Sequence, residues 1–168
     1  MAGIAITGKI KRKYMAHYVD SALPGATTPA YVRQGQDLEE YNIEMNANVE
    51  KKKNILGEVS VNIDSYEVQA SVTPYYAVVG DPLFARLQSI AEGRLTLDDV
   101  KTTVVDVHLW EEDSTTSGSF VAYKEDAVIE VSSYGGDNSG YQIPYNLHMC
   151  GNRVKGLFAL STKTFTAS

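Results

Sequence analysis

The sequence predicts a mainly β protein, a β-sandwich or barrel-like fold with one flanking helix, from two observations. Stretches of alternating apolar and polar residues recur along the chain, and strand side chains alternate between two faces. Loops rich in Gly, Ser, Asp and Asn separate several of these stretches, notably EEDSTTSGS (111–119) and GGDNSG (135–140). At 168 residues, the chain has the length of a single domain with its own core, here residues 1–168.

The clearest strand candidate covers residues 38–49. From Tyr41 onward one face would be apolar, and the opposite face would hold amides and carboxylates without a cation. A partner run follows at 59–63, so the two stretches predict a long hairpin whose connection, at about 51–57, projects from the body. The alternation changes phase at Asp64 and Ser65, which predicts a bend, bulge or short turn there. Further strands are expected at 102–111, 119–124, 127–134, 142–149 and 154–160.

One helix is expected at about 82–92, in the stretch DPLFARLQSIAEG. Asp81 is placed to cap it, Pro82 suits the first turn, and Gly93 suits the left-handed conformation that ends many helices. An apolar stripe at helical spacing should pack on the sheet. Its members are Leu83, Phe84, Leu87, Ile90 and Ala91. Before the strands, residues 1–35 mix Gly, Pro, Ala and Thr and are expected to form an N-terminal arm.

The charge distribution along the chain is uneven, although the net charge is −6. Through Lys53 there are eight cations and six acids, whereas the remainder carries seven cations and fifteen acids. This balance argues against an ordinary nucleic-acid reader, which presents a basic face to phosphates. It suits either charge-complementary contacts between copies of the chain or two solvated sets of charges.

The sequence contains no recognisable leader or membrane-spanning run, and its single cysteine, Cys150, cannot form an internal disulfide. We therefore expect synthesis in a reducing cytoplasm and no membrane insertion. The three histidines, His17, His108 and His148, lack metal-ligand spacing. His108 shares a strand face with Trp110 and is expected to be packed, and His148 near Cys150 lacks a third orienting group. We expect no catalytic residue, no metal and no cofactor, and hence not an enzyme.

Two cationic clusters, KIKRKY (9–14) and the lysines at 51–53, allow three interpretations each. They could contact phosphate, they could be solvated, or they could dock on an acidic patch of a neighbouring copy. Neither cluster decides among these interpretations by itself.

Five stretches, taken in order and spacing, together resemble the major tail protein (tail tube protein) family of tailed bacteriophages. They cover nearly the whole chain: GKIKRKYMAHY, YVRQGQDLEEYNIEMNANVEKKKNILGEVSVNIDSYE, YYAVVGDPLF, KTTVVDV and YQIPYNLHMCGNRVKGLFALSTKTFTAS. The most specific features are the KKNILGE hairpin before a strand, the DPLF helix start and GNRVKG as a turn between strands.

The resemblance implies a structural virion protein, made in the host bacterial cytoplasm, that forms hexameric rings. Such rings stack into a hollow tail tube through which genome DNA passes transiently and without sequence specificity. The implied partners are other copies of the chain and other tail proteins, namely the tape measure, tail tip and terminator proteins.

The resemblance also implies roles for particular residues. The N-terminal arm, 1–35, and the projecting hairpin loop, 50–58, would supply contacts between rings: Lys9, Lys11, Arg12, Lys13, Lys51, Lys52, Lys53, Ile55 and Leu56. The polar face of the hairpin region either lines the lumen of such a tube, where carboxylates and neutral amides do not hold passing phosphates, or is an ordinary solvent-exposed face. The lumen candidates are Asn42, Glu44, Asn46, Asn48, Glu50, Asn62 and Asp64.

Other functions remain open from the sequence. The inner tube of a contractile tail or of a tail-like bacteriocin would share this fold and assembly. A monomeric β-sandwich that binds glycans, or an adhesin module, would account for the 11 tyrosines. An enzyme on a jelly-roll scaffold is the least favoured alternative.

Overall fold

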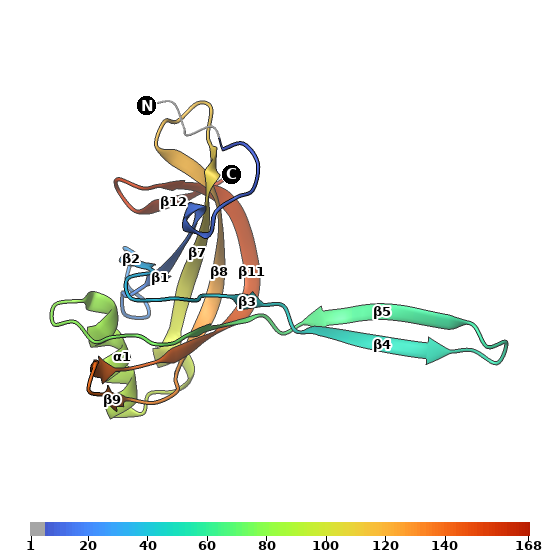
Figure 1. Ribbon diagram of the computed structural model, residues 1–168, viewed down its shortest axis with the longest axis horizontal. Coiled ribbons are helices and arrows are strands. Elements are labelled where there is room, and N and C mark those ends of the chain that lie inside the picture. Colours follow the sequence, from blue (N-terminus) through green and yellow to red (C-terminus); the bar gives the residue numbers. More distant parts are fainter. Residues whose placement is uncertain (1–5) are drawn as a thin grey trace.

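The protein is a curved antiparallel sheet with one helix against it and a long two-stranded ribbon projecting from its side (Figure 1). The computed structural model describes residues 6–168. Its elements are η1 (Arg12–Tyr14), β1 (Met15–Asp20), β2 (Tyr31–Gln34), β3 (Ile43–Glu44), β4 (Ala47–Lys53), β5 (Val59–Tyr66), β6 (Gln69–Val72), α1 (Pro82–Gly93), η2 (Leu97–Val100), β7 (Lys101–Glu112), β8 (Ser119–Val131), β9 (Gly135–Asp137), β10 (Gly140–Gln142), β11 (Tyr145–Ala159) and β12 (Thr164–Ala167). The mainly β prediction is confirmed.

The main sheet has eight strands, seven of them in the order β2-β1-β7-β8-β11-β6-β3. The eighth, β12, pairs with Gly156–Ala159 of β11, while β6 pairs with the other end of that strand. The sheet curls strongly, because Tyr31 on β2 lies 5.7 Å from Phe158 on β11, ring centre to ring centre, although three strands separate them in the sheet. This closure gives a sandwich-like body rather than a flat sheet.

The curled sheet buries side chains on both of its faces. In β7 the consecutive residues Val104 and Val105 are both buried, and they belong to two different apolar clusters. One cluster packs the sheet against α1 and includes Val104, while the other gathers Tyr18, Tyr31 and Phe158 where the sheet folds over itself. Strands buried on both faces lose the polar alternation of a half-buried strand.

The expected helix is confirmed, and its apolar stripe faces the sheet. Leu83, Leu87 and Ile90 are buried, with Phe84 and Ala91 partly buried against the same cluster. Asp81 caps the helix, since its carboxylate accepts a hydrogen bond of 2.9 Å from the Leu83 amide.

Arg86 and Arg94 are features of this helix that the sequence did not indicate. Arg86 is buried and donates to the carbonyls of Ala22 and Lys101, which ties the helix to a loop and to β7. The left-handed residue after the helix is Arg94, with φ 49°, so the expectation for Gly93 is wrong.

Two pairs of expected strands are single long strands. β8 covers 119–124 and the first part, 127–131, of the strand expected at 127–134, and β11 covers most of 142–149 and 154–160. The GNRVKG stretch is therefore not a turn between strands. It lies inside β11, where Gly151 (φ 93°) and Asn152 (φ 56°) both have positive φ and the pairing with β8 shifts register on either side of Gly151.

The N-terminal arm is much shorter than expected. Within 1–35, β1 lies inside the main sheet between β2 and β7, and its residues 16–19 are buried. Residues 1–5 of the expected arm lie outside the described residues. Along residues 6–168, no helix is long and apolar enough to cross a membrane.

Candidate assembly surface

The β4–β5 ribbon extends well beyond the body, to the far end of the long axis (Figure 1). The two strands pair with each other as a separate two-stranded sheet. All fifteen of their residues are exposed. An isolated hairpin is only marginally stable in water, so a ribbon of this length is suited to being covered by a partner.

The ribbon begins where the expected continuous strand of 38–49 breaks. Asn46 takes a left-handed conformation with φ 43°, and it separates β3 from β4. Its backbone oxygen accepts from the Glu67 amide at 3.1 Å, and its side-chain amide donates to the Glu67 oxygen at 3.0 Å. The prediction of one uninterrupted strand was wrong because Asn tolerates this conformation and bonds the backbone locally.

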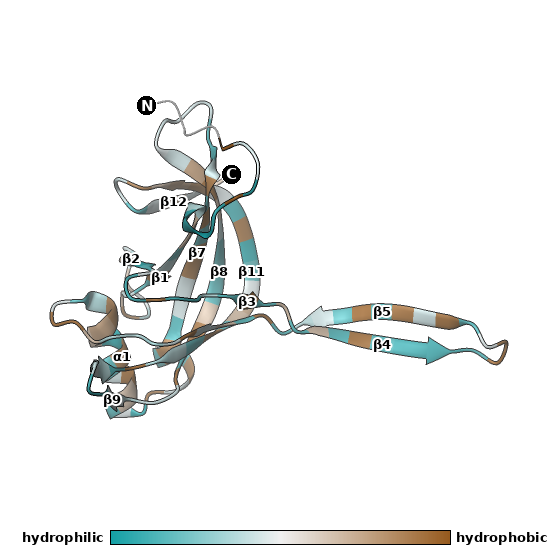
Figure 2. Ribbon diagram, viewed as in Figure 1, coloured by the Kyte–Doolittle hydropathy of each residue, from teal (hydrophilic) through white to brown (hydrophobic). Residues whose placement is uncertain are grey.

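The pairing register divides the ribbon into two faces. Val49 pairs with Ile63, Lys51 with Val61 and Lys53 with Val59, which places cations and aliphatic side chains together on one face. The opposite face is polar and pairs Glu50 with Asn62 and Lys52 with Ser60. Figure 2 shows the aliphatic bands along β5 in brown.

The phase change expected at Asp64 and Ser65 is a β-bulge. Asn48 pairs with Ser65 while Val49 pairs with Ile63, so Asp64 is the extra residue. The bulge returns Tyr66 to the face of Val61 and Ile63, and the prediction is confirmed.

The tip of the ribbon holds two aliphatic side chains in solvent. The Asn54 side chain accepts from the amides of Leu56 at 3.0 Å and Glu58 at 2.9 Å, and Gly57 supplies a positive φ of 86°. Ile55 is 103% exposed and Leu56 is 78% exposed. Because these hydrogen bonds fix the turn, the Ile55 and Leu56 side chains are held in a defined position.

The expected loop at 50–58 is shorter than the sequence suggested. The connection is residues 54–58, and Lys51, Lys52 and Lys53 belong to β4. Because Lys52 lies on the polar face and pairs with Glu50 at 3.2 Å, that face does carry a cation, contrary to expectation.

The lumen candidates do not form one continuous strip. Asn48, Glu50 and Asn62 share the polar face of the ribbon. The others are spread over four settings, listed here: Asn42 bonds Glu40, Glu44 on β3 accepts from Gln69 at 3.1 Å, Asn46 bonds Glu67, and Asp64 is the bulge residue. The break at Asn46 separates Asn42 and Glu44 from the ribbon, and the bulge sets Asp64 apart from Asn62.

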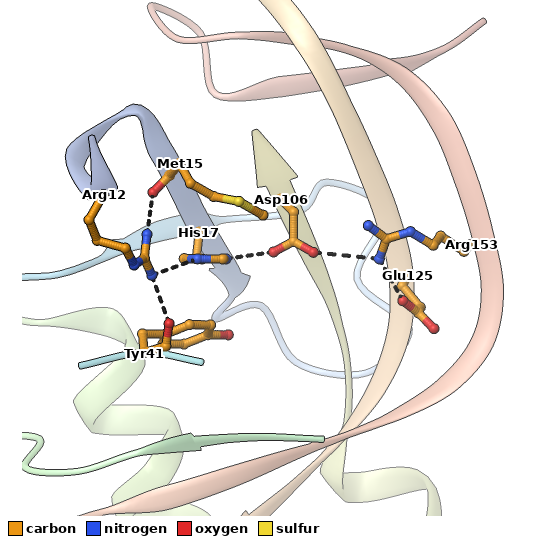
Figure 3. A network of polar contacts seen from close by, with 7 residues as sticks. All are labelled: Arg12, Met15, His17, Tyr41, Asp106, Glu125 and Arg153. Carbon is orange, nitrogen blue, oxygen red and sulfur yellow. Dashed lines mark hydrogen bonds and ion pairs between the residues drawn. The ribbon is translucent and has the colours of Figure 1, made fainter. Parts of the chain in front are cut away.

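A buried polar network anchors the chain just before the ribbon (Figure 3). His17 Nδ1 lies 2.6 Å from a carboxylate oxygen of Asp106, and its Nε2 lies 2.9 Å from Arg12 Nη2. Since a guanidinium only donates, Nε2 accepts and Nδ1–H donates to Asp106. Arg12 also donates to the Tyr41 carbonyl at 2.8 Å, and the Tyr41 ring stacks on His17 at 4.2 Å.

Asp106 extends this network across the sheet to Glu125 on β8 and Arg153 on β11. Arg153 lies 3.5 Å from its second carboxylate oxygen and 2.9 Å from Glu125. Burial raises the pKa of Tyr41 well above its ordinary value, with a further contribution from the Asp106 charge. The network therefore fixes the approach to the ribbon, and both His17 nitrogens are occupied.

Arg12 thus hydrogen-bonds to the body but remains exposed, and its assignment as an inter-ring contact stays a prediction. Lys9, Lys11 and Lys13 are exposed, and Lys13 lies over the Tyr14 ring at 5.3 Å. Sequence reasoning missed the network because 89 residues separate His17 from Asp106. Correct pairing of 15–19 with 104–108 would have placed them opposite each other.

The other two histidines have exposed or half-buried partners. His108 stacks on Trp110 at 4.4 Å and bonds Glu111 at 2.8 Å. His148 lies 2.5 Å from Glu130, and this hydrogen bond, with a second from Asn146, lowers the pKa of Glu130. Burial raises the pKa of the Cys150 thiol, with the Asp126 charge adding to it, which opposes thiolate formation.

Within the described part of the chain, no three His, Cys, Asp or Glu side chains are grouped to hold a metal ion. The fold and this surface define a mainly β, sandwich-like protein with a projecting amphipathic ribbon. No family model matches the sequence, and no curated protein matches it either.

Proposed function

We propose that this protein is the tail tube subunit of a tailed bacteriophage, a structural virion protein that polymerises as stacked hexameric rings. The observation that carries the proposal is the β4–β5 ribbon, whose aliphatic and cationic face is exposed along its whole length. Ring symmetry and DNA passage come from the sequence resemblance. The curled sheet with a single flanking helix is compatible with the tail tube fold.

Assembly would resolve two liabilities of the isolated subunit. The ribbon leaves Val59, Val61 and Ile63 in water, where apolar area is costly. The edge strands of the sheet leave backbone groups unpaired, which makes them templates for pairing with another chain. Contact with further copies would cover both kinds of surface, and a head-to-tail contact that closes on itself gives a ring.

The polar face of the ribbon supports a separate role in the lumen. Asn48, Glu50 and Asn62 present amides and a carboxylate, and the nearby Lys52 is partly neutralised by Glu50. A wall of this composition makes few cationic contacts with DNA phosphates. Few counterions are then released, and the affinity of the wall for DNA is low. Under this proposal, Glu50→Lys leaves tubes intact and slows DNA release in a phage carrying it.

The test is electron microscopy of the purified chain across a range of protein concentrations, with and without tail-tip complexes as initiators. We expect hollow tubes or stacked rings. Lys51→Glu combined with Lys52→Glu and Lys53→Glu should reduce tube growth while the thermal unfolding midpoint stays unchanged. A chain that stays monomeric with initiators present contradicts the proposal.

A glycan-binding module is the second candidate, and one observation favours it. His108, Trp110 and Tyr123 form a half-buried aromatic group, and the Arg153 guanidinium lies 4.7 Å from the Tyr123 ring centre. Aromatic faces beside polar groups suit sugar rings. Binding of a monomer to a glycan array, abolished by Trp110→Ala, would favour this candidate.

A further inference from the structure

We propose that Arg12, His17 and Tyr41 form a proton-sensitive latch, which ties the chain before β1 to the segment 35–42 and opens in acid. The latch acts within one chain, so it does not depend on the proposed function. Its parts come from η1, from β1 and from the connection between β2 and β3. Figure 3 shows the Arg12 guanidinium bonded to both His17 and the backbone of Tyr41.

The latch can close only while His17 is neutral. Arg12 Nη2 lies 2.9 Å from His17 Nε2 and donates to the Tyr41 carbonyl at 2.8 Å. A protonated imidazole carries a hydrogen on both nitrogens, so Nε2 would face the guanidinium as a second donor and a second positive charge. The contact with Asp106 uses Nδ1–H, which is present in both states. Protonation therefore breaks the Arg12 side of the network and keeps the Asp106 side.

Opening the latch would release the segment that leads to the ribbon. Residues 35–42 connect β2 to β3 and contain no helix or strand. Tyr41 anchors them, since its ring is buried and stacks on the His17 ring at 4.2 Å while Arg12 holds its carbonyl. Without Arg12 that carbonyl loses its donor, and the segment before Asn46 and β4 gains freedom to move.

A cavity gives solvent access to the latch. It has a volume of about 590 Å³, and Arg12, His17 and Tyr41 all line it. Arg12 is exposed, whereas His17 and Tyr41 are buried. Movement of the guanidinium into the cavity would therefore open Nε2 to water while the sheet stays intact.

The charges that face His17 oppose one another. Those that favour a positive imidazole are Asp106 on β7 and, along the cavity, Glu39 and Glu40. Those that disfavour it are Arg12 and Lys13 of η1 and Arg33 of β2. Glu125 and Arg153 lie beyond Asp106, and the uncharged titratable neighbours are Tyr41, Tyr123 and His108 on the adjoining strands, and Tyr145, which bonds Gln34 opposite His17. Arg12 alone among the described cations contacts Nε2, so its charge should dominate the competition with the proton.

NMR spectroscopy of the isotope-labelled wild-type chain tests the latch directly. His17 should carry its hydrogen on Nδ1 above neutral pH and take up a second proton as the pH falls, since histidine is the side chain that ordinarily titrates in this range. Residues 35–42 should become mobile with the same midpoint, while β7 and β8 stay ordered. A His17 that stays neutral until the chain unfolds, or that is protonated while 35–42 stay rigid, overturns the inference.

Arg12→Met tests the competition, and Lys13→Met is the matched control. Because Arg12 and the proton exclude each other at Nε2, removing Arg12 must favour the proton. The titration midpoint of His17 should rise by about one pH unit or more, a tenfold gain in proton affinity, and residues 35–42 should be mobile at every pH. Arg12 is exposed, so this variant should fold.

Lys13→Met removes a cation from the same cavity, one that lies over the Tyr14 ring. Solvent screens such a charge, so the His17 midpoint should move by less than about 0.3 pH unit and residues 35–42 should keep the wild-type behaviour. Equal shifts in the two variants, or no shift in Arg12→Met, would show that Arg12 and His17 do not form a latch.

Discussion

At the scale of single residues, the fold depends on a few buried polar groups that have every partner they need. Among the described residues, no buried side-chain nitrogen or oxygen lacks a hydrogen-bond partner. Asp106 is 2% exposed and accepts from His17 while lying beside Arg153. Removing Asp106 leaves the buried Nδ1–H of His17 without an acceptor, which costs more than the loss of an exposed pair.

Asp106→Ala should therefore lower the free energy of unfolding by about 1.5–3 kcal/mol, the range for a hydrogen bond to a charged group. The matched control is Glu130→Ala, which removes the exposed carboxylate 2.5 Å from His148. The control should cost less than about 1 kcal/mol. Chemical denaturation of both variants measures the difference, and equal losses would contradict this reading of the network.

Tyr145 gives the protein a sensitivity to alkaline pH. Its ring is fully buried and its hydroxyl donates to Gln34 at 2.8 Å, and burial raises its pKa well above the ordinary value. A raised pKa means that the folded state retains the proton. The stabilisation that the buried Tyr145 hydroxyl contributes is thus complete below the ordinary tyrosine pKa of about 10. It is lost as the pH rises above that value toward the raised pKa.

Tyr145→Phe should weaken that alkaline loss of stability. At neutral pH it should cost about 1–2 kcal/mol, because the Gln34 side chain loses a buried partner. Thermal unfolding between neutral pH and pH values above 10 provides the measurement. A variant whose stability falls with pH as steeply as that of wild type would show that other groups dominate.

At the scale of elements, the sequence indicated local features well and breaks in strands poorly. The α1 boundaries followed from Asp81, Pro82 and an apolar stripe, all of which lie within one helix. The bulge at Asp64 followed from a change of phase. The break at Asn46 gave no signal of this kind. The alternation of apolar and polar residues continues through Asn46 in the sequence, although the backbone turns there.

Other misses depended on distant contacts. β1 was interpreted as part of an arm because its burial on both faces needs β7 beside it, some 85 residues away. The ribbon itself was predicted, but its lysines were placed in a loop although they pair locally, Lys51 with Val61 and Lys53 with Val59.

Asp81→Ala tests the element that the sequence predicted best. The change removes the cap on the Leu83 amide and a hydrogen bond from the Tyr75 hydroxyl. It should cost about 1–2 kcal/mol in the free energy of unfolding. Thr96, which precedes η2 and makes no capping hydrogen bond through its side chain, provides a control, and Thr96→Ala should change stability by less than about 0.5 kcal/mol.

At the scale of the whole molecule, the body and the ribbon are built as separable parts. Neither apolar cluster of the body contains a residue of β4 or β5. The chain ends that enter and leave the ribbon already meet, through the two hydrogen bonds between Asn46 and Glu67. The body should therefore fold without the ribbon, and association should need it.

Excision of residues 47–66, with Asn46 joined to Glu67 through two glycines, tests this separation. The variant should unfold cooperatively within a few degrees of the wild-type midpoint, because no buried apolar residue is lost. It should also remain monomeric at concentrations where wild type assembles. Loss of the cooperative transition would show that the ribbon contributes to the core.

The hydrogen-bonded junction at Asn46 and Glu67 also makes the ribbon adjustable in length. Adding two residues to each strand would extend its reach by about 6–7 Å and keep each side chain on its present face. Adding one residue to each strand would exchange the faces and turn Val61 toward the side now held by Glu50. Lengths are therefore allowed in steps of residue pairs, so in the proposed assembly the ribbon would set a distance between copies that can be changed without redesigning the body.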